Sequence, residues 1–253
     1  MWEFFDRLIS DIDESIEVKD FVIGARWSAV LSDEGGVGIA PVFIERFDRF
    51  DMSYTPSYGM TLKEMAEGIY KWNFFEAALA LAAINAYYNA PSRNISDMEH
   101  APGGRRSKKA FKNFCSKYTV EGRSLFIEPY YDSDEMADIP GRIDVIRSNP
   151  EFRDYIYAAY DELIESVDRV FISGAAIVNR SVSGIIKKAD ALNKEIIFTG
   201  PDVPVAPSLF KNGIKESFGF IVDDVDKFMI KAKSAMYRDD FFVLGHFAGL
   251  HFK

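Results

Sequence analysis

In the second half of the chain, short apolar segments alternate with stretches of helical periodicity. The apolar segments are rich in Val, Ile and Phe, which is typical of strands that are buried on both faces. The expected strands are 124–128, 143–146, 169–172, 195–198 and 217–222, and the expected helices lie near 107–118, 151–166, 178–191 and 224–237. This alternation predicts an α/β fold, a mainly parallel sheet with helices on both faces.

The first half has a different pattern. An amphipathic helix at the start precedes three segments rich in β-branched residues, 18–23, 26–31 and 37–43, which Gly24 and the turn residues 33–36 separate. Such spacing predicts an antiparallel meander. Thr61 and Glu64 have the spacing of a capping box, and the pattern after them predicts two helices with a break near 72–73. The first half should therefore form a smaller α+β domain.

Residues 89–106 contain two prolines, two adjacent glycines and no apolar period. A segment of this composition is typical of a connection. We therefore expect two domains, 1–100 and 101–253.

Charge and cysteine content exclude several classes of protein. The chain has 39 acidic and 30 basic side chains, a formal net charge of −9, and a surface of this kind repels nucleic-acid phosphates. Its single cysteine, Cys115, excludes an internal disulfide framework. The acidic start is unlike a signal peptide, and the longest apolar run is too short to span a bilayer. We expect a cytoplasmic protein without nucleic-acid or membrane partners. The sequence is compatible with either a monomer or a homo-oligomer.

The loop after strand 169–172 is the first candidate ligand site. Ligands of doubly wound sheets lie beyond the carboxyl ends of strands. There, Ser173, Gly174 and Ala175 allow a ligand to approach the backbone, and Asn179 offers a directional hydrogen bond. The alternative is an ordinary tight turn between a strand and a helix.

A second loop, after strand 195–198, should lie at the same edge of the sheet. It contains Gly200, Pro201, Asp202 and Pro204, and its prolines make it rigid enough for a preorganised site. The alternative is that the prolines only end the strand. From the first domain, Asn85 is expected to close one side of this cleft, unless it is buried elsewhere and satisfies backbone groups.

Other clusters of functional side chains point to a site less clearly. The carboxylates of the loop 129–138 suit either a hard cation or a solvated acidic loop, and they are Asp132, Asp134, Glu135 and Asp138. The spacing of the histidines does not match a zinc helix, and they are His100, His246 and His251. A basic cluster suits either an anionic ligand or a solvated helix face, and it consists of Arg93, Arg105, Arg106, Lys108, Lys109 and Lys112. No metal ligands are assigned from these patterns.

Several stretches, in this order, resemble a family of two-domain prokaryotic proteins of unknown function for which heavy-metal chelation has been proposed. They are Ala82-Ala-Ile-Asn-Ala-Tyr-Tyr-Asn89, Arg147-Ser-Asn-Pro150, Asp168-Arg-Val-Phe-Ile-Ser-Gly174 with Val178-Asn179, and Gly200-Pro-Asp-Val-Pro204 followed by Pro207. The resemblance implies an enolase-amino-terminal-like domain, then a Rossmann-like domain, with a ligand site at their junction. This sequence has Glu128-Pro129 where the family pattern has a glycine-histidine pair.

We therefore expect a protein that binds a small anionic ligand in the cleft between its domains, or a metal ion or metal-bearing cofactor. The cofactor itself is not identified by the sequence. An alternative is an enzyme, a lyase or transferase, in which Asp202 or Glu128 transfers protons and Asn179 orients the substrate. A structural subunit without a ligand is the third possibility.

Overall fold

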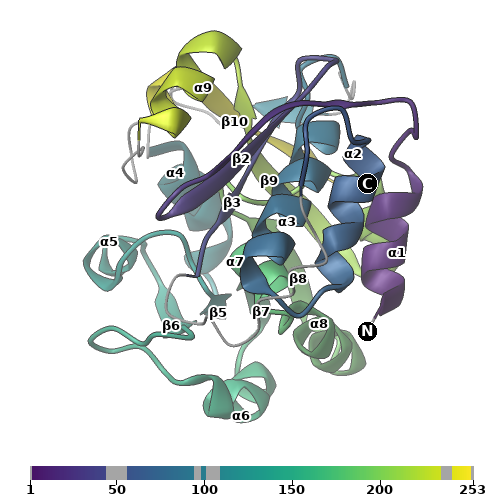
Figure 1. The fold of residues 1–253 in the computed structure, drawn as a ribbon. Helices are drawn as coiled ribbons and strands as arrows, with labels where there is room; N and C mark the ends of the chain where they lie inside the picture. The colour runs from purple at the N-terminus through teal and green to yellow at the C-terminus, as the bar shows by residue number, and fades with distance from the viewer. Residues whose placement is uncertain (1, 44–55, 94–97, 101–108, 235–240, 252–253) are drawn as a thin grey trace.

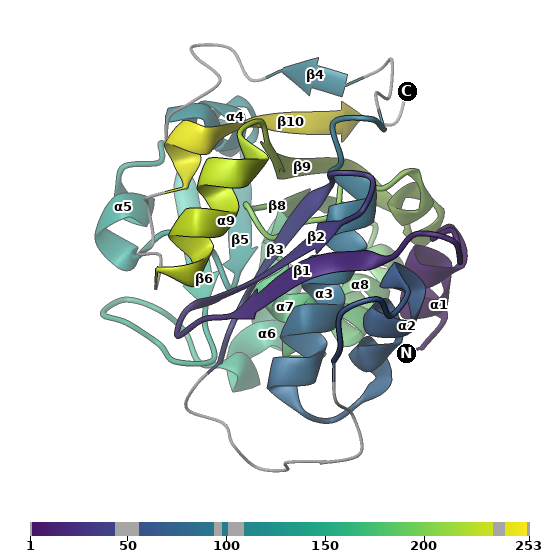
Figure 2. The same ribbon diagram turned by 45° about the horizontal axis from the view of Figure 1, so that its top comes forward.

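The computed structural model describes residues 2–43, 56–93, 109–234 and 241–251, together with the backbone of 98–100. Figures 1 and 2 show that the two halves of the chain pack closely against each other. The strands of these residues form two separate sheets. The small sheet is an antiparallel meander of β1 (Val18–Ile23), β2 (Trp27–Ser32) and β3 (Val37–Pro41), as the sequence predicts.

The large sheet has seven strands in the order β4-β10-β9-β8-β7-β5-β6. They are β4 (Met98–His100), β5 (Arg123–Ile127), β6 (Arg142–Ile146), β7 (Arg169–Ile172), β8 (Glu195–Thr199), β9 (Ile214–Val222) and β10 (Gly245–His251). The strands β5 to β9 are parallel, whereas β10 is antiparallel to β9 and β4 is antiparallel to β10. The mainly parallel sheet is confirmed. The sequence reading missed β10 and β4, and β4 joins the large sheet immediately before the predicted domain boundary.

Helices cover both faces of the large sheet (Figures 1 and 2). The first half contributes α1 (Trp2–Ser10), α2 (Leu62–Ala66), η1 (Glu67–Tyr70) and α3 (Phe74–Tyr88). The second half contributes α4 (Lys109–Thr119), α5 (Ser133–Ala137), η2 (Tyr157–Ala159), α6 (Tyr160–Ser166), α7 (Ala175–Val178), α8 (Val182–Ala191), η3 (Pro207–Asn212), α9 (Val225–Lys233) and η4 (Phe242–Leu244).

Side-chain alternation along the central strands divides the interior between the two faces. On β7, Val170 and Ile172 belong to a core cluster that also contains the buried faces of α1, α3 and α8, whereas Phe171 belongs to a second cluster with α4 and α9. The ring of Phe4 in α1 stacks on Phe198 in β8, with centroids 6.1 Å apart. The first core cluster is therefore built by both halves of the chain.

The helix α3 is almost entirely buried because it packs against the small sheet and against the first core cluster. The side-chain oxygen of Asn73 accepts from the N–H of Phe75 and caps the start of this helix, at the predicted break. Where α3 packs against the small sheet, a Cβ atom added to Gly38 of β3 would lie 2.0 Å from the main-chain oxygen of Ala82. Glycine at this position lets β3 approach the backbone of the helix.

Two predicted helices have different limits in the structure. The region 151–166 becomes helical only at η2 and α6. The predicted helix 178–191 begins later, as α8 at Val182, and follows a separate short helix, α7, that was not predicted. Between α7 and α8, Arg180 has a φ of +67°, a left-handed conformation that cannot continue a right-handed helix. The capping box of Thr61 and Glu64 is confirmed at the start of α2. Within the described part of the chain, no helix is long and apolar enough to cross a membrane.

Candidate functional site

The large sheet has a topological switch point at β5 and β7. The next strand in the chain after β5, β6, pairs with β5 on one side, and the strand after that, β7, pairs with β5 on the other side. In sheets of this type, the crevice beyond the carboxyl ends of these two strands is the usual ligand site. The residues that follow β5 and β7 are Glu128 and Ser173.

A cavity of about 280 Å³ lies beside this point, between the two halves of the chain. Its first wall comes from the start of β2 and the end of β3 and consists of Arg26, Trp27, Pro41, Val42 and Phe43. Its second wall comes from the loops of the large sheet and consists of Glu128, Pro129, Tyr130, Glu151, Ala175 and Asp202. The first wall is apolar apart from its arginine, whereas the second contains three carboxylates.

The carboxylate of Glu128 is held by hydrogen bonds from Ser148 and Asn179. Its Oε1 atom accepts from the N–H of Ser148 at 2.7 Å and from Nδ2 of Asn179 at 3.0 Å, and also from the Ser148 hydroxyl. Burial raises the pKa of Glu128, and the two hydrogen bonds from Ser148 and the charge of Arg147 oppose the increase. The residue has a φ of +51°, an unusual conformation for a residue other than glycine.

Asp202 is the most deeply buried carboxyl group of the cavity wall, with 3% of its surface exposed. The backbone N–H groups of Gly174 and Ala175 partly offset the effect of burial on its pKa, whereas Oδ1 has no hydrogen-bond partner among the described residues. Burial raises the pKa of Asp202 to about 6, and the negative charge of Glu128 adds to this increase. The group therefore changes its protonation close to neutral pH.

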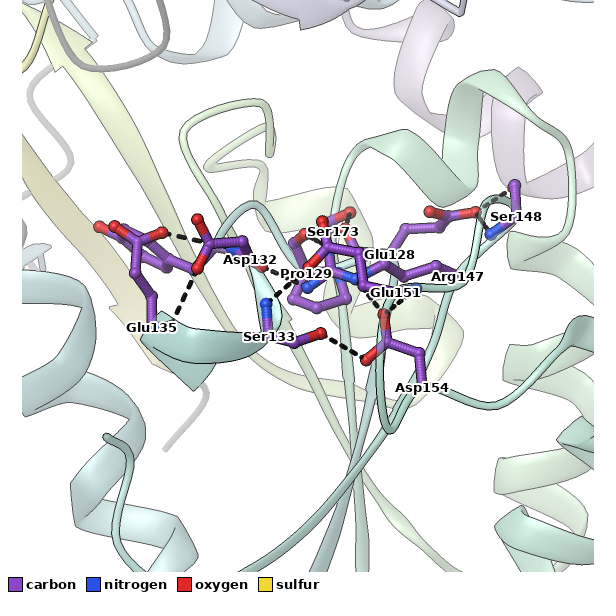
Figure 3. A network of polar contacts seen from close by, with 11 residues as sticks. Glu128, Pro129, Asp132, Ser133, Glu135, Arg147, Ser148, Glu151, Asp154 and Ser173 are labelled. Atoms are coloured by element: carbon purple, nitrogen blue, oxygen red, sulfur yellow. Dashed lines mark hydrogen bonds and ion pairs between the residues drawn. The ribbon is translucent and has the colours of Figure 1, made fainter. Parts of the chain in front are cut away.

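Arg147, which lies in one of the stretches of the family resemblance, fixes the loop that follows β5 (Figure 3). Its Nη1 atom donates to the main-chain oxygen of Pro129 at 2.7 Å, Nη2 donates to that of Tyr131, and Nε donates to Asp154 at 2.6 Å. The other Asp154 oxygen accepts from the hydroxyl of Ser133 at 2.9 Å. A buried ion pair thus holds the carboxylate-bearing wall in place.

The same network reaches a second carboxylate of the cavity. Oε2 of Glu151 accepts from the N–H of Ser133 at 2.7 Å, so Glu151 is also attached to the start of α5 (Figure 3). The positions of the cavity carboxylates therefore depend on hydrogen bonds between the loops after β5 and β6.

Most of the residues predicted for the site lie together. The hydroxyl of Ser173 donates to the main-chain oxygen of Glu128, and Ala175 and Asp202 line the cavity. A Cβ atom at Gly174 would lie 2.1 Å from the main-chain oxygen of Asp202, so the two predicted loops touch. Gly200, with a φ of +153°, lies equally close: a Cβ atom there would lie 2.5 Å from Oδ1 of Asp202.

Besides Gly174, Gly200 and Ser173, four predicted residues are not among those that line the cavity. Asn179 holds Glu128 and also donates to Tyr157 at 3.2 Å. Asn85 is fully buried, and its Nδ2 donates to the main-chain oxygens of Ile39 and Asp202, both at 2.8 Å. Pro204 accepts a hydrogen bond from Ser217, and Pro201 is buried within the same loop. These contacts make Asn179 and Asn85 positioning residues.

Sequence reasoning missed the first wall altogether. Arg26 and Trp27 belong to a strand whose placement against the second half carries no local signal. Tyr130 and Glu151 had a weak signal, because both lie in loops after predicted strands. The aromatic character of Trp27 and Tyr130, whose ring centroids are 5.5 Å apart, marks the contact between the walls.

The residues present do not fit a soft heavy metal. In the described ranges, no group of three or more His, Cys, Asp or Glu side chains is placed to hold an ion. Cys115 is buried in the second core cluster, where desolvation raises its thiol pKa and so disfavours the thiolate that a soft metal needs. The carboxylates Asp132 and Glu135 form a capping box at the start of α5.

The described part of the basic cluster consists of Arg93, Lys109 and Lys112. Arg93 pairs with Glu34 at 2.8 Å, and Lys112 lies 3.7 Å from Asp138. Arg105, Arg106 and Lys108 lie outside the described residues, as does the side chain of His100. His246 and His251 contact Asp223 and Glu216 respectively.

Comparison with known proteins identifies the family of the chain. Two families, both described as "Putative heavy-metal chelation", match the chain: DUF4213 over residues 5–88 and DUF364 over residues 135–246. An uncharacterized protein of Methanocaldococcus jannaschii is 26% identical over 239 residues, which cover 90% of this chain and 88% of that protein.

Two crystal structures of DUF364 proteins of unknown function have the same fold. The protein from Desulfitobacterium hafniense has a TM-score of 0.81 and 24% identity and covers 99% of this chain and 98% of its own. The protein from Pyrococcus horikoshii has a TM-score of 0.80 and 19% identity and covers 98% of this chain and 100% of its own. The two matched regions, in this order and together covering more than three quarters of the chain, show that the protein belongs to the DUF4213 and DUF364 family described as "Putative heavy-metal chelation".

Proposed function

We propose that the protein binds a small organic ligand in the cavity between the small sheet and the loops after β5, β7 and β8. The observation that carries this proposal is the carboxyl group of Asp202. It is buried, has a raised pKa, and belongs to the wall of a cavity at the topological switch point. Because shifted pKa values and concave pockets concentrate at functional sites, a carboxyl group with both features is a candidate for a ligand contact.

The charges of the two walls indicate the chemistry of this ligand. Glu128, Glu151 and Asp202 would repel an anionic group, whereas Arg26 on the opposite wall would attract one. The expected anionic ligand therefore needs a second feature: an ammonium group or another hydrogen-bond donor that faces Asp202. Amino acids and amino-substituted organic acids have this combination, and they fit the volume of the cavity.

Isothermal titration and thermal-shift measurements with a panel of small amino acids and their deaminated analogues test the proposal. A panel member should stabilise the wild type, while its deaminated analogue should not. Asp202→Asn and Arg26→Gln should each abolish the response, whereas Asp134→Asn, which neutralises an exposed carboxylate outside the cavity, should keep it.

Equal stabilisation of the wild type and both cavity variants would place the ligand elsewhere. A wild-type protein that responds to no member of the panel, and whose native mass is that of the bare chain, would contradict the proposal directly.

An enzyme is the second candidate, and the pKa of Asp202 favours it. A carboxyl group with a pKa of about 6 can both release and accept a proton near neutral pH. In this reading, Asp202 transfers the proton and Asn179 holds Glu128 rather than the substrate. If a ligand from the panel is converted, the rate should depend on a group with a pKa near 6, and Asp202→Asn should remove that dependence.

A further inference from the structure

The cavity between the two halves of the chain is lined mainly by apolar side chains, and many of them are aromatic. Seven of its eleven residues are apolar or aromatic, and three of these seven are Trp27, Phe43 and Tyr130. The four charged residues of the wall suit the ammonium and carboxylate groups of the proposed ligand. The apolar residues therefore surround the rest of the ligand, which is its side chain.

Trp27 and Tyr130 come from opposite walls of the cavity and lie in contact. Their ring centroids are 5.5 Å apart and their planes are inclined by 43°, so the two rings do not cover each other face to face. Each ring packs on another ring that does not line the cavity: Trp27 on Phe241 at 5.4 Å and Tyr130 on Phe242 at 5.5 Å, both in T-shaped contacts. Rings fixed in this way are preorganised, so a ligand that packs on them orders little additional structure.

The third aromatic residue of the wall is held in a similar way. Phe43 follows β3 and is half-buried, and its ring centroid lies 6.0 Å from that of Phe74, the first residue of α3. The three rings of the wall thus come from three different segments of the chain, and each is supported by a ring outside the cavity.

The backbone beside these rings offers few hydrogen bonds to a ligand. Pro41 and Pro129 have no N–H group, and the main-chain oxygen of Pro129 already accepts from Nη1 of Arg147 at 2.7 Å. The N–H of Val42 donates to the main-chain oxygen of Arg26 at 2.9 Å. A ligand group beside these residues gains from burial rather than from hydrogen bonds, which disfavours a polyhydroxylated side chain.

The volume of the cavity limits the size of this group. Small-molecule sites span roughly 300 to 1,000 Å³, and this cavity, at about 280 Å³, lies just below that range. Such a volume suits one aromatic group with an amino and a carboxyl group, whereas a dinucleotide is too large for it.

We propose that the ligand of this cavity is an amino acid or amino-substituted acid with an aromatic side chain, whose ring packs on Trp27, Phe43 and Tyr130. The inference rests on the proposed function, because the ammonium group of the same ligand faces Asp202. Contact between aromatic rings strengthens binding beyond the effect of the buried area, by about twofold to tenfold for one pair.

Isothermal titration with phenylalanine, tyrosine and tryptophan tests the inference, with cyclohexylalanine and alanine as controls. Cyclohexylalanine differs from phenylalanine only in that its ring is not aromatic. At least one aromatic amino acid should bind, and about twofold to tenfold more tightly than cyclohexylalanine. Alanine, which has no ring, should bind about tenfold or more weakly than that aromatic amino acid.

A matched pair of variants examines the wall itself. Tyr130→Phe keeps the ring and should keep the preference for the aromatic amino acid over cyclohexylalanine. Tyr130→Leu removes the ring from a half-buried position and should reduce this preference by about twofold or more. Tyr58→Leu removes an aromatic ring that is 68% exposed and lies outside the cavity, so the preference should stay the same.

The outcomes separate this inference from the proposed function. Equal affinity for the aromatic amino acids and cyclohexylalanine would overturn the aromatic side chain and leave the amino-acid ligand in place, as would tighter binding of alanine. An unchanged preference in Tyr130→Leu would also overturn the inference. Binding of 3-phenylpropionate as tightly as phenylalanine would instead contradict the ammonium contact of the proposed function and leave the ring contact in place. No binding by any of these amino acids would overturn both.

Discussion

The side-chain amide of Asn85 donates to the main-chain oxygen of Asp202 over 2.8 Å and so connects α3 with the loop that carries the buried cleft carboxyl. The same Nδ2 atom also donates to Ile39 of β3 at 2.8 Å. One amide group from the first half of the chain therefore joins the small sheet, the central helix and the ligand loop of the second half. The position of Asp202 depends on a residue that is distant in sequence.

Replacement of this amide should destabilise the fold. In Asn85→Ala, two buried main-chain oxygens lose their donor, and we expect the free energy of unfolding to fall by about 2 to 3 kcal/mol. Urea denaturation measures the change. A decrease below about 0.5 kcal/mol would show that the two oxygens find other donors.

The raised pKa of Asp202 should make stability depend on pH. Its pKa is about 6 in the folded protein and 3.8 in its ordinary state, so the folded chain retains a proton that the unfolded chain has lost. The unfavourable contribution develops as the pH rises from about 4 to about 6 and reaches about 3 kcal/mol above that range. Relative to Asp202→Asn, the wild type should lose stability over this interval.

Urea denaturation of both proteins between pH 4 and pH 7 measures this difference, because titrations of other groups cancel in the comparison. A difference that stays constant across the interval would contradict the raised pKa.

Two arginine–aspartate pairs test the importance of burial. Arg147 to Asp154 and Arg123 to Asp144 have the same Nε to Oδ2 distance, 2.6 Å, but the arginine side chain is 10% exposed in the first pair and 38% in the second. Arg147→Met removes the positive charge that neutralises the buried Asp154 carboxylate and the donor of two main-chain oxygens, so we expect a loss of about 3 to 5 kcal/mol.

Arg123→Met is the matched control and should cost about 1 kcal/mol or less. Denaturation curves of the two variants at one pH provide the comparison. Equal losses would mean that the Arg147 network does not hold the cleft wall.

Glycine substitutions probe the contact between the two ligand loops. Gly174→Ala places a methyl group 2.1 Å from the Asp202 main-chain oxygen, so one loop must move, and we expect a loss of about 1 to 3 kcal/mol. Gly184→Ala meets no atom within 4 Å and replaces a glycine inside a helix, so stability should rise by about 0.5 to 1 kcal/mol. A Gly174→Ala variant that melts at or above the temperature of the wild type would contradict the packing described for Gly174.

Much of the second half could be predicted because its signals are local. An apolar run bounded by turn residues marks each central strand, and the rule for parallel sheets places the loops of Gly174 and Asp202 at one edge. The long-range contacts had no such signal. Whether Asn85 faces a cavity or a main-chain oxygen depends on how α3 lies against β3, which is set by close contacts such as that of Gly38 with Ala82.

The same reasoning explains the missed elements. The strand β10 is interrupted by glycines and follows the last predicted helix, so its apolar pattern is weak. The start of α8 at Val182, later than predicted, depends on the left-handed conformation of Arg180, for which the sequence has no local signal. The first wall of the cleft could not be predicted, because Arg26 reaches it only through the docking of one sheet against the other.

The stacking of Phe4 on Phe198 belongs to a core cluster that both halves of the chain complete. Neither half can bury its apolar surface alone: without α1 and α3, the sheet residues Leu125, Val170 and Ile196 would face water. We therefore expect the two family regions to unfold together in one transition. Fragments cut between them would expose the apolar surface of this shared core, so we expect neither region to remain folded and monomeric alone.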